Sequence, residues 1–244
     1  VLDTKRQLGI VYTPLIMAIT AINVEHMTEK EVAELLEALS QSVIETKKFF
    51  IDLLESMSSF SRSMNLNHEQ LIGLKILLEF DPTSDFEKVV SDLAKENMAN
   101  VESTFVFTSK TSPIHAYLAE QRAVKFFLTS ISASIPEAIS ENEVLLPTKS
   151  MSLVLEAIDK VLETYHKTNV CFVFDILSEL FTSIGQEKTF IFLRNALDML
   201  SSEKITCLFL LNTSSHEPEV VSRTRQLFPN LLAYDKNGLK IVKT

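Results

Sequence analysis

The sequence predicts an α/β fold in which a mostly parallel sheet, covered by helices on both faces, follows an all-helical N-terminal region. Three observations carry this prediction. Helical periodicity dominates residues 1–100, strands that are apolar throughout alternate with helices over residues 101–244, and an Asn-Gly dipeptide marks a final hairpin. We therefore expect a domain boundary near residue 100.

Composition excludes several classes of protein. The chain has 244 residues with a net charge of −9, and an acidic surface repels phosphate backbones, which argues against general nucleic-acid binding. Only 4 glycines are present, and they are far apart. No phosphate-binding loop or nucleophile elbow that needs two glycines can therefore be written anywhere in the chain.

The first segment, residues 7–24, carries no charged side chain. Its length is at the lower limit for a membrane-spanning helix, but Pro14 and several polar residues interrupt it. A buried helix from Pro14 to about Asn23 is the simpler interpretation, and membrane association through residues 7–24 is the alternative. Cys171 and Cys207 lie in apolar runs without metal-ligand or redox spacing, so we expect buried free thiols and a reducing, cytoplasmic setting.

A long amphipathic helix is expected next, over residues 28–60. Thr28 and Glu31 have the spacing of a capping box, and apolar residues then alternate by four and three. One interpretation is a helix packed in a local bundle, and the other is a homodimerisation helix; both remain open. The dimerisation residues would be Val32, Leu36, Leu39, Val43, Phe50, Leu53, Met57 and Phe60.

Two shorter helices complete the expected helical region. Asn67 and Gln70 can cap a helix that continues through Leu78, and Ser84 with Glu87 can cap another that continues to about Asn97. Successive short helices raise the alternative of a transcription-related or signalling protein that reads DNA, although the acidic balance argues against it.

The α/β region is expected to alternate strands and helices up to the hairpin. The expected strands are 103–108, 123–129, 143–146, 170–174, 205–211, 231–234 and 239–242, and the expected helices are 113–121, 151–166, 189–200 and 218–228. Ligands of such sheets bind beyond the carboxyl ends of the strands, so the polar residues there are the candidates for a site.

A family resemblance appears at one of these strand ends. The run Cys-Phe-Val-Phe-Asp-Ile-Leu-Ser-Glu-Leu, residues 171–180, resembles the Walker B strand and following turn of RecA-type ATPases, in particular the KaiC-like branch. The strand ending at the polar Asn212 and the closing hairpin resemble that branch as well, so the resemblance covers roughly residues 100–244. It implies a RecA-like fold, and in an active relative Asp175 would hold Mg²⁺ of bound ATP through water.

The phosphate-binding loop of that family is where the sequence departs from the pattern. The loop follows the family's first strand, and here residues 105–108 run almost directly into Lys110 and Thr111, with Ser109 where the last glycine would be. The loop is missing, so we expect a non-catalytic regulatory or protein-interaction module without a cofactor, acting as a homodimer. The alternative is a nucleotide- or anion-binding protein or weak ATPase that uses ATP and Mg²⁺ through Lys110, Thr111, Ser112, Asp175 and Asn212.

Other catalytic arrangements have less support. The five histidines lack metal-ligand spacing, so we expect no metal site. Ser178, His216 and Asp175 could form a Ser/His/Asp site, but no local motif positions a nucleophile.

Overall fold

A computed structural model describes residues 28–119, 121 and 123–243, and the chain divides into two compact units, residues 1–56 and 57–244. The second unit is a mixed α/β domain built on one nine-stranded sheet, which confirms the predicted fold class. Its strands are β1 (Lys75–Phe80), β2 (Ser103–Ser109), β3 (Val124–Ser130), β4 (Glu137–Ser140), β5 (Glu143–Pro147), β6 (Val170–Phe174), β7 (Ile205–Asn212), β8 (Asn230–Asp235) and β9 (Gly238–Lys243).

The described part of the first unit is the helix α2 (Glu29–Ser56). Its capping box forms as predicted, because the Thr28 backbone N–H donates to Glu31 Oε2 (2.8 Å) and the Glu31 N–H donates to Thr28 Oγ1 (3.4 Å). The predicted helix at 14–23 and the uncharged stretch 7–24 lie outside the described residues. In the part of the chain that is described, no helix is both long and apolar enough to cross a membrane.

The predicted extent of the long helix, to residue 60, is wrong. Helix α2 ends at Ser56, and Met57 and Phe60 belong to the second unit. Phe60 lies in the short helix α3 (Ser59–Ser63) and is 1% exposed in the core, so its side chain is not available for a contact between chains.

The predicted helical region to residue 100 is also wrong, because β1 lies within it. The Asn67–Gln70 capping box forms, but its helix α4 covers only His68–Leu71. Gly73 then adopts φ +86°, and a Cβ there would lie 2.6 Å from the Glu203 carbonyl oxygen, so only glycine fits this turn. The chain leaves the turn as β1, an interior strand of the sheet between β7 and β8.

The helix after β1 starts later than its predicted cap. Helix α5 (Glu87–Ala99) begins after Phe86, and the Ser84 hydroxyl donates to the Asp81 carbonyl oxygen instead of capping it. The remaining helices are α6 (Pro113–Leu118), α7 (Met151–Tyr165), α8 (Leu177–Ser183), α9 (Gln186–Met199) and α10 (Pro218–Arg225).

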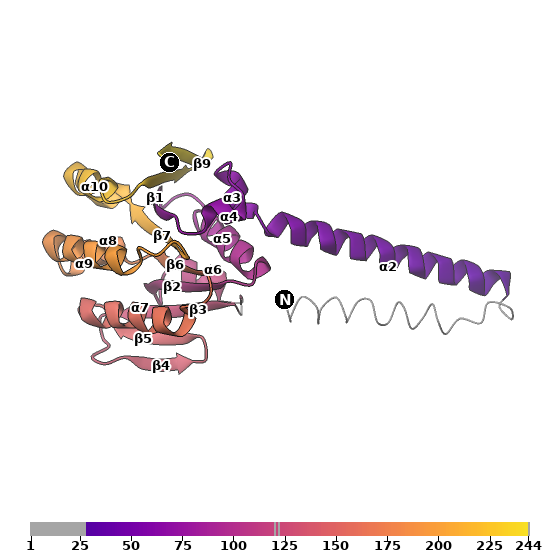
Figure 1. The fold of residues 1–244 in the computed structure, drawn as a ribbon, viewed down its shortest axis with the longest axis horizontal. Coiled ribbons are helices and arrows are strands. Elements are labelled where there is room, and N and C mark those ends of the chain that lie inside the picture. Colours follow the sequence, from indigo (N-terminus) through magenta and orange to yellow (C-terminus); the bar gives the residue numbers. More distant parts are fainter. Residues whose placement is uncertain (1–27, 120, 122, 244) are drawn as a thin grey trace. The chain divides into compact units, whose positions relative to one another are not determined.

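The sheet order is β4-β5-β3-β2-β6-β7-β1-β8-β9. Seven central strands are parallel, and an antiparallel strand closes each edge, β4 at one and β9 at the other. The β8–β9 hairpin was predicted, whereas β4 was not. Helices α3–α6 cover one face of the sheet and α7–α10 cover the other (Figure 1).

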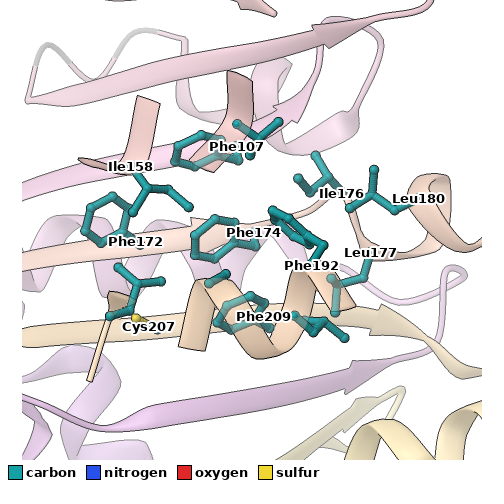
Figure 2. Close-up of a cluster of buried hydrophobic side chains, with 14 of the residues drawn as sticks. Phe107, Ile158, Phe172, Phe174, Ile176, Leu177, Leu180, Phe192, Cys207 and Phe209 are labelled. Carbon is teal, nitrogen blue, oxygen red and sulfur yellow. The ribbon is translucent and has the colours of Figure 1, made fainter. Parts of the chain in front are cut away.

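Phenylalanine rings from neighbouring strands make the core under α7–α10. Phe107 stacks on Phe174 (centroids 5.0 Å apart), and Phe174 stacks on Phe209 (4.3 Å), as Figure 2 shows. Side chains alternate between faces along each strand. Cys207 therefore packs in this core while Cys171 packs in the core on the other face; both are free thiols, as predicted.

A buried charged cluster attaches the first short helices to α5. Glu96 is fully buried, and its Oε2 accepts hydrogen bonds from the backbone N–H groups of Phe60 and Ser61 (2.7 and 2.9 Å). Its Oε1 lies 2.9 Å from His68 Nδ1, and Glu102 lies 3.3 Å from the other ring nitrogen. Burial lowers the pKa of His68, but hydrogen bonds to Glu102 and Glu96 outweigh it and raise the pKa to about 9.

Candidate functional site

Two crevices are expected at the carboxyl edge of the sheet. The chain leaves β1 and β2 toward the helices of one face, and leaves β6 and β7 toward the helices of the other. In the sheet, β2 is next to β6, and β7 is next to β1. Connections therefore diverge to opposite faces at both places, and such switch points are where open α/β sheets bind ligands.

Asp175 occupies the β2/β6 switch point. Its Oδ2 accepts hydrogen bonds from the hydroxyls of Thr108 (2.7 Å) and Ser112. Ser112 in turn accepts the Ile114 N–H and caps α6, which begins at Pro113. Burial raises the pKa of Asp175 to about 6, although both hydroxyl donors act in the opposite direction. The carboxylate is thus held by the chain's own hydroxyls at the start of a short helix.

The other predicted anion-binding residues lie elsewhere. Lys110 and Thr111 line a pocket of about 860 Å³ beyond β2, β3 and β5, and Glu179 lines the same pocket. The Glu179 carboxylate accepts a hydrogen bond from Thr129 (3.0 Å). Asn212 is used locally, because its Oδ1 accepts from both the N–H and the hydroxyl of Ser214 (3.1 and 2.7 Å). The structure therefore separates the five predicted residues into three places.

The β7/β1 switch point has an acidic lining that the sequence did not reveal. A pocket of about 320 Å³ there is lined by Glu79, Asp81 and Asp235, among others. Arg225 binds Glu79 through two hydrogen bonds of 2.6 and 2.7 Å, and Asp81 accepts from the Thr83 N–H and hydroxyl (both 2.8 Å). These residues were missed because β1 was predicted to be the end of a helix.

The prediction of where a phosphate loop would follow the first strand is wrong for the same reason. The first strand of the sheet is β1 and not the strand at 103–109, so the loop after the first strand is the segment from Asp81 to Phe86. That segment reads Asp-Pro-Thr-Ser-Asp-Phe and contains neither glycine nor lysine. The match of Lys110 and Thr111 to the end of a phosphate loop rested on the wrong strand.

Ser178 and His216 do come together. His216 Nε2 lies 3.0 Å from Ser178 Oγ, which also accepts the Asn212 N–H (3.3 Å), and burial lowers the pKa of His216. Within the described ranges no carboxylate bonds to His216, because Asp175 faces Thr108 and Ser112. Neither Ser178 nor His216 lines a described pocket. Among the described residues, the pair therefore lacks the orienting acid of a Ser/His/Asp site.

A metal site is not formed by the described side chains either: they contain no group of three or more His, Cys, Asp or Glu residues that could hold an ion. The carboxylates of Asp175, Glu79 and Asp81 instead accept hydrogen bonds from Thr108, Arg225 and Thr83, respectively.

Comparison with known proteins supports the fold. No protein-family model matches the chain, and no curated protein matches it. Among solved structures 186 chains match, so the fold is widely shared and cannot by itself identify a function. One of them, described as a structural study of Project ID PH0250 from Pyrococcus horikoshii OT3, has a TM-score of 0.51. It is 13% identical, and the likeness covers 71% of this chain and 87% of that chain, which shows a common α/β fold.

Proposed function

We propose that this chain is a non-catalytic relative of the KaiC-like ATPases that acts as a regulatory, protein-interaction module and works as a homodimer. One observation carries the proposal: the loop after β1, at the β7/β1 switch point, has aspartates and neither glycine nor lysine, where a nucleotide phosphate would need hydrogen-bond donors. Glu79, Asp81 and Asp235 line the pocket there, and at the other switch point the Thr108 and Ser112 hydroxyls are bound to Asp175.

The electrostatics of these crevices oppose phosphate binding. Phosphate sites are made from backbone N–H groups in glycine-permitted loops and from cationic side chains. The loop after β1 has two aspartates and no lysine, and Arg225 is already bound to Glu79. A triphosphate placed there would lie against like charges in a partly dehydrated pocket, where repulsion is less screened than in water.

The expected dimer rests on α2. An isolated helix in water is marginally stable, so an amphipathic helix normally depends on a partner for its apolar stripe. Leu36 and Val43, two residues of the predicted dimerisation stripe, are 59% and 57% exposed, and Val32, Leu39 and Phe50 are partly exposed. A second copy of α2 would cover these side chains.

Isothermal titration of the full chain with ATP and Mg²⁺ tests the first part of the proposal. We expect no binding heat and no phosphate release, and the same result for an Asp175→Asn variant. Micromolar binding with turnover that Asp175→Asn abolishes would contradict a non-catalytic role.

The second candidate is an anion- or nucleotide-binding protein that uses the larger pocket. Lys110 favours it, because this ammonium lines the pocket and makes no hydrogen bond or ion pair with any described residue. Saturable binding of ATP or inorganic phosphate that Lys110→Gln removes, and Lys149→Gln leaves intact, would support it. Glu179 on the opposite lining disfavours an anion there.

A further inference from the structure

The two edges of the sheet carry opposite charge. At the β4 edge, the segment from residue 131 to residue 143 contains Glu137, Glu141 and Glu143 and no lysine or arginine. Glu143 is bonded to His115 (2.9 Å), whereas Glu137 and Glu141 bond to none of the described residues. We call this segment the acidic edge.

The acidic edge is also apolar. Ile131 and Ile135 are each 71% exposed, and Ile139 in β4 is 44% exposed. All four residues of β4 are exposed, and among the described strands only β5 pairs with it. A strand at the edge of a sheet presents backbone N–H and C=O groups that an additional strand can use.

The opposite edge, β9 with its turn, is basic. It contains Lys236, Lys240 and Lys243 and no acidic residue after Asp235, which pairs with Lys240 (2.6 Å). Ile241 and Val242 are exposed on the same strand. We call the segment from residue 236 to residue 243 the basic edge; β8 is the one described strand that pairs with β9.

The charges select which edges can meet. Two acidic edges brought together would place glutamates against glutamates, and two basic edges would place lysines against lysines; like charges on paired strands are destabilising. Edge charges of this kind normally protect a sheet from self-pairing. Here that protection fails for one combination, because an acidic edge and a basic edge attract and both offer exposed apolar side chains.

We propose that the basic edge of one copy pairs with the acidic edge of the next, so that the α/β units associate head to tail through a continuous sheet. Strands β4 and β9 both run antiparallel to the central strands, so units in the same orientation would meet with β9 and β4 parallel. Each unit has one edge of each kind, and such a heterologous contact builds either an open chain of units or a closed ring. The association is separate from the α2 dimer.

Sedimentation velocity of the full chain over a range of concentrations tests the proposal. We expect the weight-average mass to rise with concentration at about 0.1 M salt and to fall at about 1 M salt, where the screening length shrinks from about 10 Å to about 3 Å. Two variants isolate the edges: Glu137→Lys with Glu141→Lys, and Lys240→Glu with Lys243→Glu. Circular dichroism verifies that each remains folded.

The decisive measurement is a mixture of the two variants. Each variant alone has two edges of one sign and should stay at the mass that the unchanged chain has at its lowest concentration. An equimolar mixture should associate again, because each variant then supplies the complement of the other. A chain that carries all four substitutions should also regain self-association.

Lys167→Glu with Lys204→Glu is the matched control for the basic-edge variant, since it makes the same change in net charge as Lys240→Glu with Lys243→Glu but at exposed positions away from both edges. It should associate like the unchanged chain. Three results would overturn the proposal: a mass that does not rise with concentration, variants that associate as before, or a mixture that remains unassociated. If the partner of the acidic edge is a different basic protein, the mass of this chain alone will not rise with concentration.

Discussion

Helices α2 and α7 have similar apolar periodicity but different surroundings. In α7, Val154 and Ile158 are fully buried against the phenylalanine core, whereas in α2 Leu36 and Val43 are more than half exposed. The pattern of a helix thus predicts that it has an apolar stripe, but the stripe does not say what covers it. For α7 the cover is the chain's own sheet. For the exposed positions of α2 we propose a second copy of the chain, as above.

The largest expected loss in the free energy of unfolding comes from a substitution in the core under α7. Phe174→Ala removes a ring that stacks on Phe107 and Phe209, and we expect it to lower the free energy of unfolding by about 3–5 kcal/mol. The matched change on the exposed stripe, Leu36→Ala, should alter the unfolding of the α/β unit by less than about 0.5 kcal/mol. Urea unfolding followed by circular dichroism measures both; equal losses would contradict the division into two units.

A second large effect is expected at the buried charged cluster. Glu96→Ala leaves the N–H groups of Phe60 and Ser61 and the His68 ring without their acceptor. Removing one partner of a buried pair costs about 3–5 kcal/mol. Glu87→Ala, at the partly exposed start of the same helix, is the control and should have a small effect in the same assay.

The pH dependence of stability should show the contribution of His68 apart from that of Glu96. Its pKa is raised from 6.5 to about 9 in the folded chain, so its contribution is complete below pH 6.5 and is lost as the pH rises through about 9. We expect a loss on the order of 3 kcal/mol across that interval. His68→Gln should remove this slope; an unchanged slope would mean that another group causes it.

Glu96 determines how the stability of the folded chain falls at low pH. Burial raises the pKa of Glu96, but bonds from His68, Ser61 and Phe60 outweigh it, and the net pKa is below its ordinary 4.5. The stability that Glu96 contributes is therefore complete above pH 4.5 and is lost as the pH falls through the depressed value. A urea midpoint that falls on both sides of an interval from about pH 4.5 to 6.5 is the expected profile.

The smallest effect on stability, and a specific effect on association, is expected on α2. Leu36→Ser with Val43→Ser should leave the unfolding of the α/β unit nearly unchanged but shift the dimer to monomer at low concentration. Glu37→Ser with Lys48→Ser, which changes exposed polar positions and keeps the net charge, is the control. Light scattering after size exclusion distinguishes the two; a monomer before any substitution would contradict the proposed dimer.

Much of the fold was predictable because its signals are local. Capping residues identified the starts of α2 and α4, apolar runs identified β6 and β7, and Asn237-Gly238 identified the final hairpin. Strand β1 was missed because six mostly apolar residues after a helix cap fit either a helix or a strand. Its state is decided by pairing with β7 and β8, more than 100 residues away in the sequence.

The candidate site was less predictable because it depends on neighbours in the sheet and not in the chain. A polar residue after each strand could be named, but the strand order decides which of them meet. Asp175 bonds to Thr108 and Ser112 because β2 lies beside β6, and Glu79 enters a pocket only because β1 is a strand. The pairing of His68 with Glu96 is likewise a contact across 28 residues that no motif marks.

The reactivity of the two cysteines can report when helices detach from either face of the sheet. Cys171 and Cys207 are fully buried on opposite faces, and burial raises the pKa of both thiols, so neither is a reactive thiolate while its layer is closed. A thiol-labelling reagent would react only when helices leave the face above each residue. Without any substitution, peptide mapping of the two labelled sites would time how each helical layer detaches from the sheet.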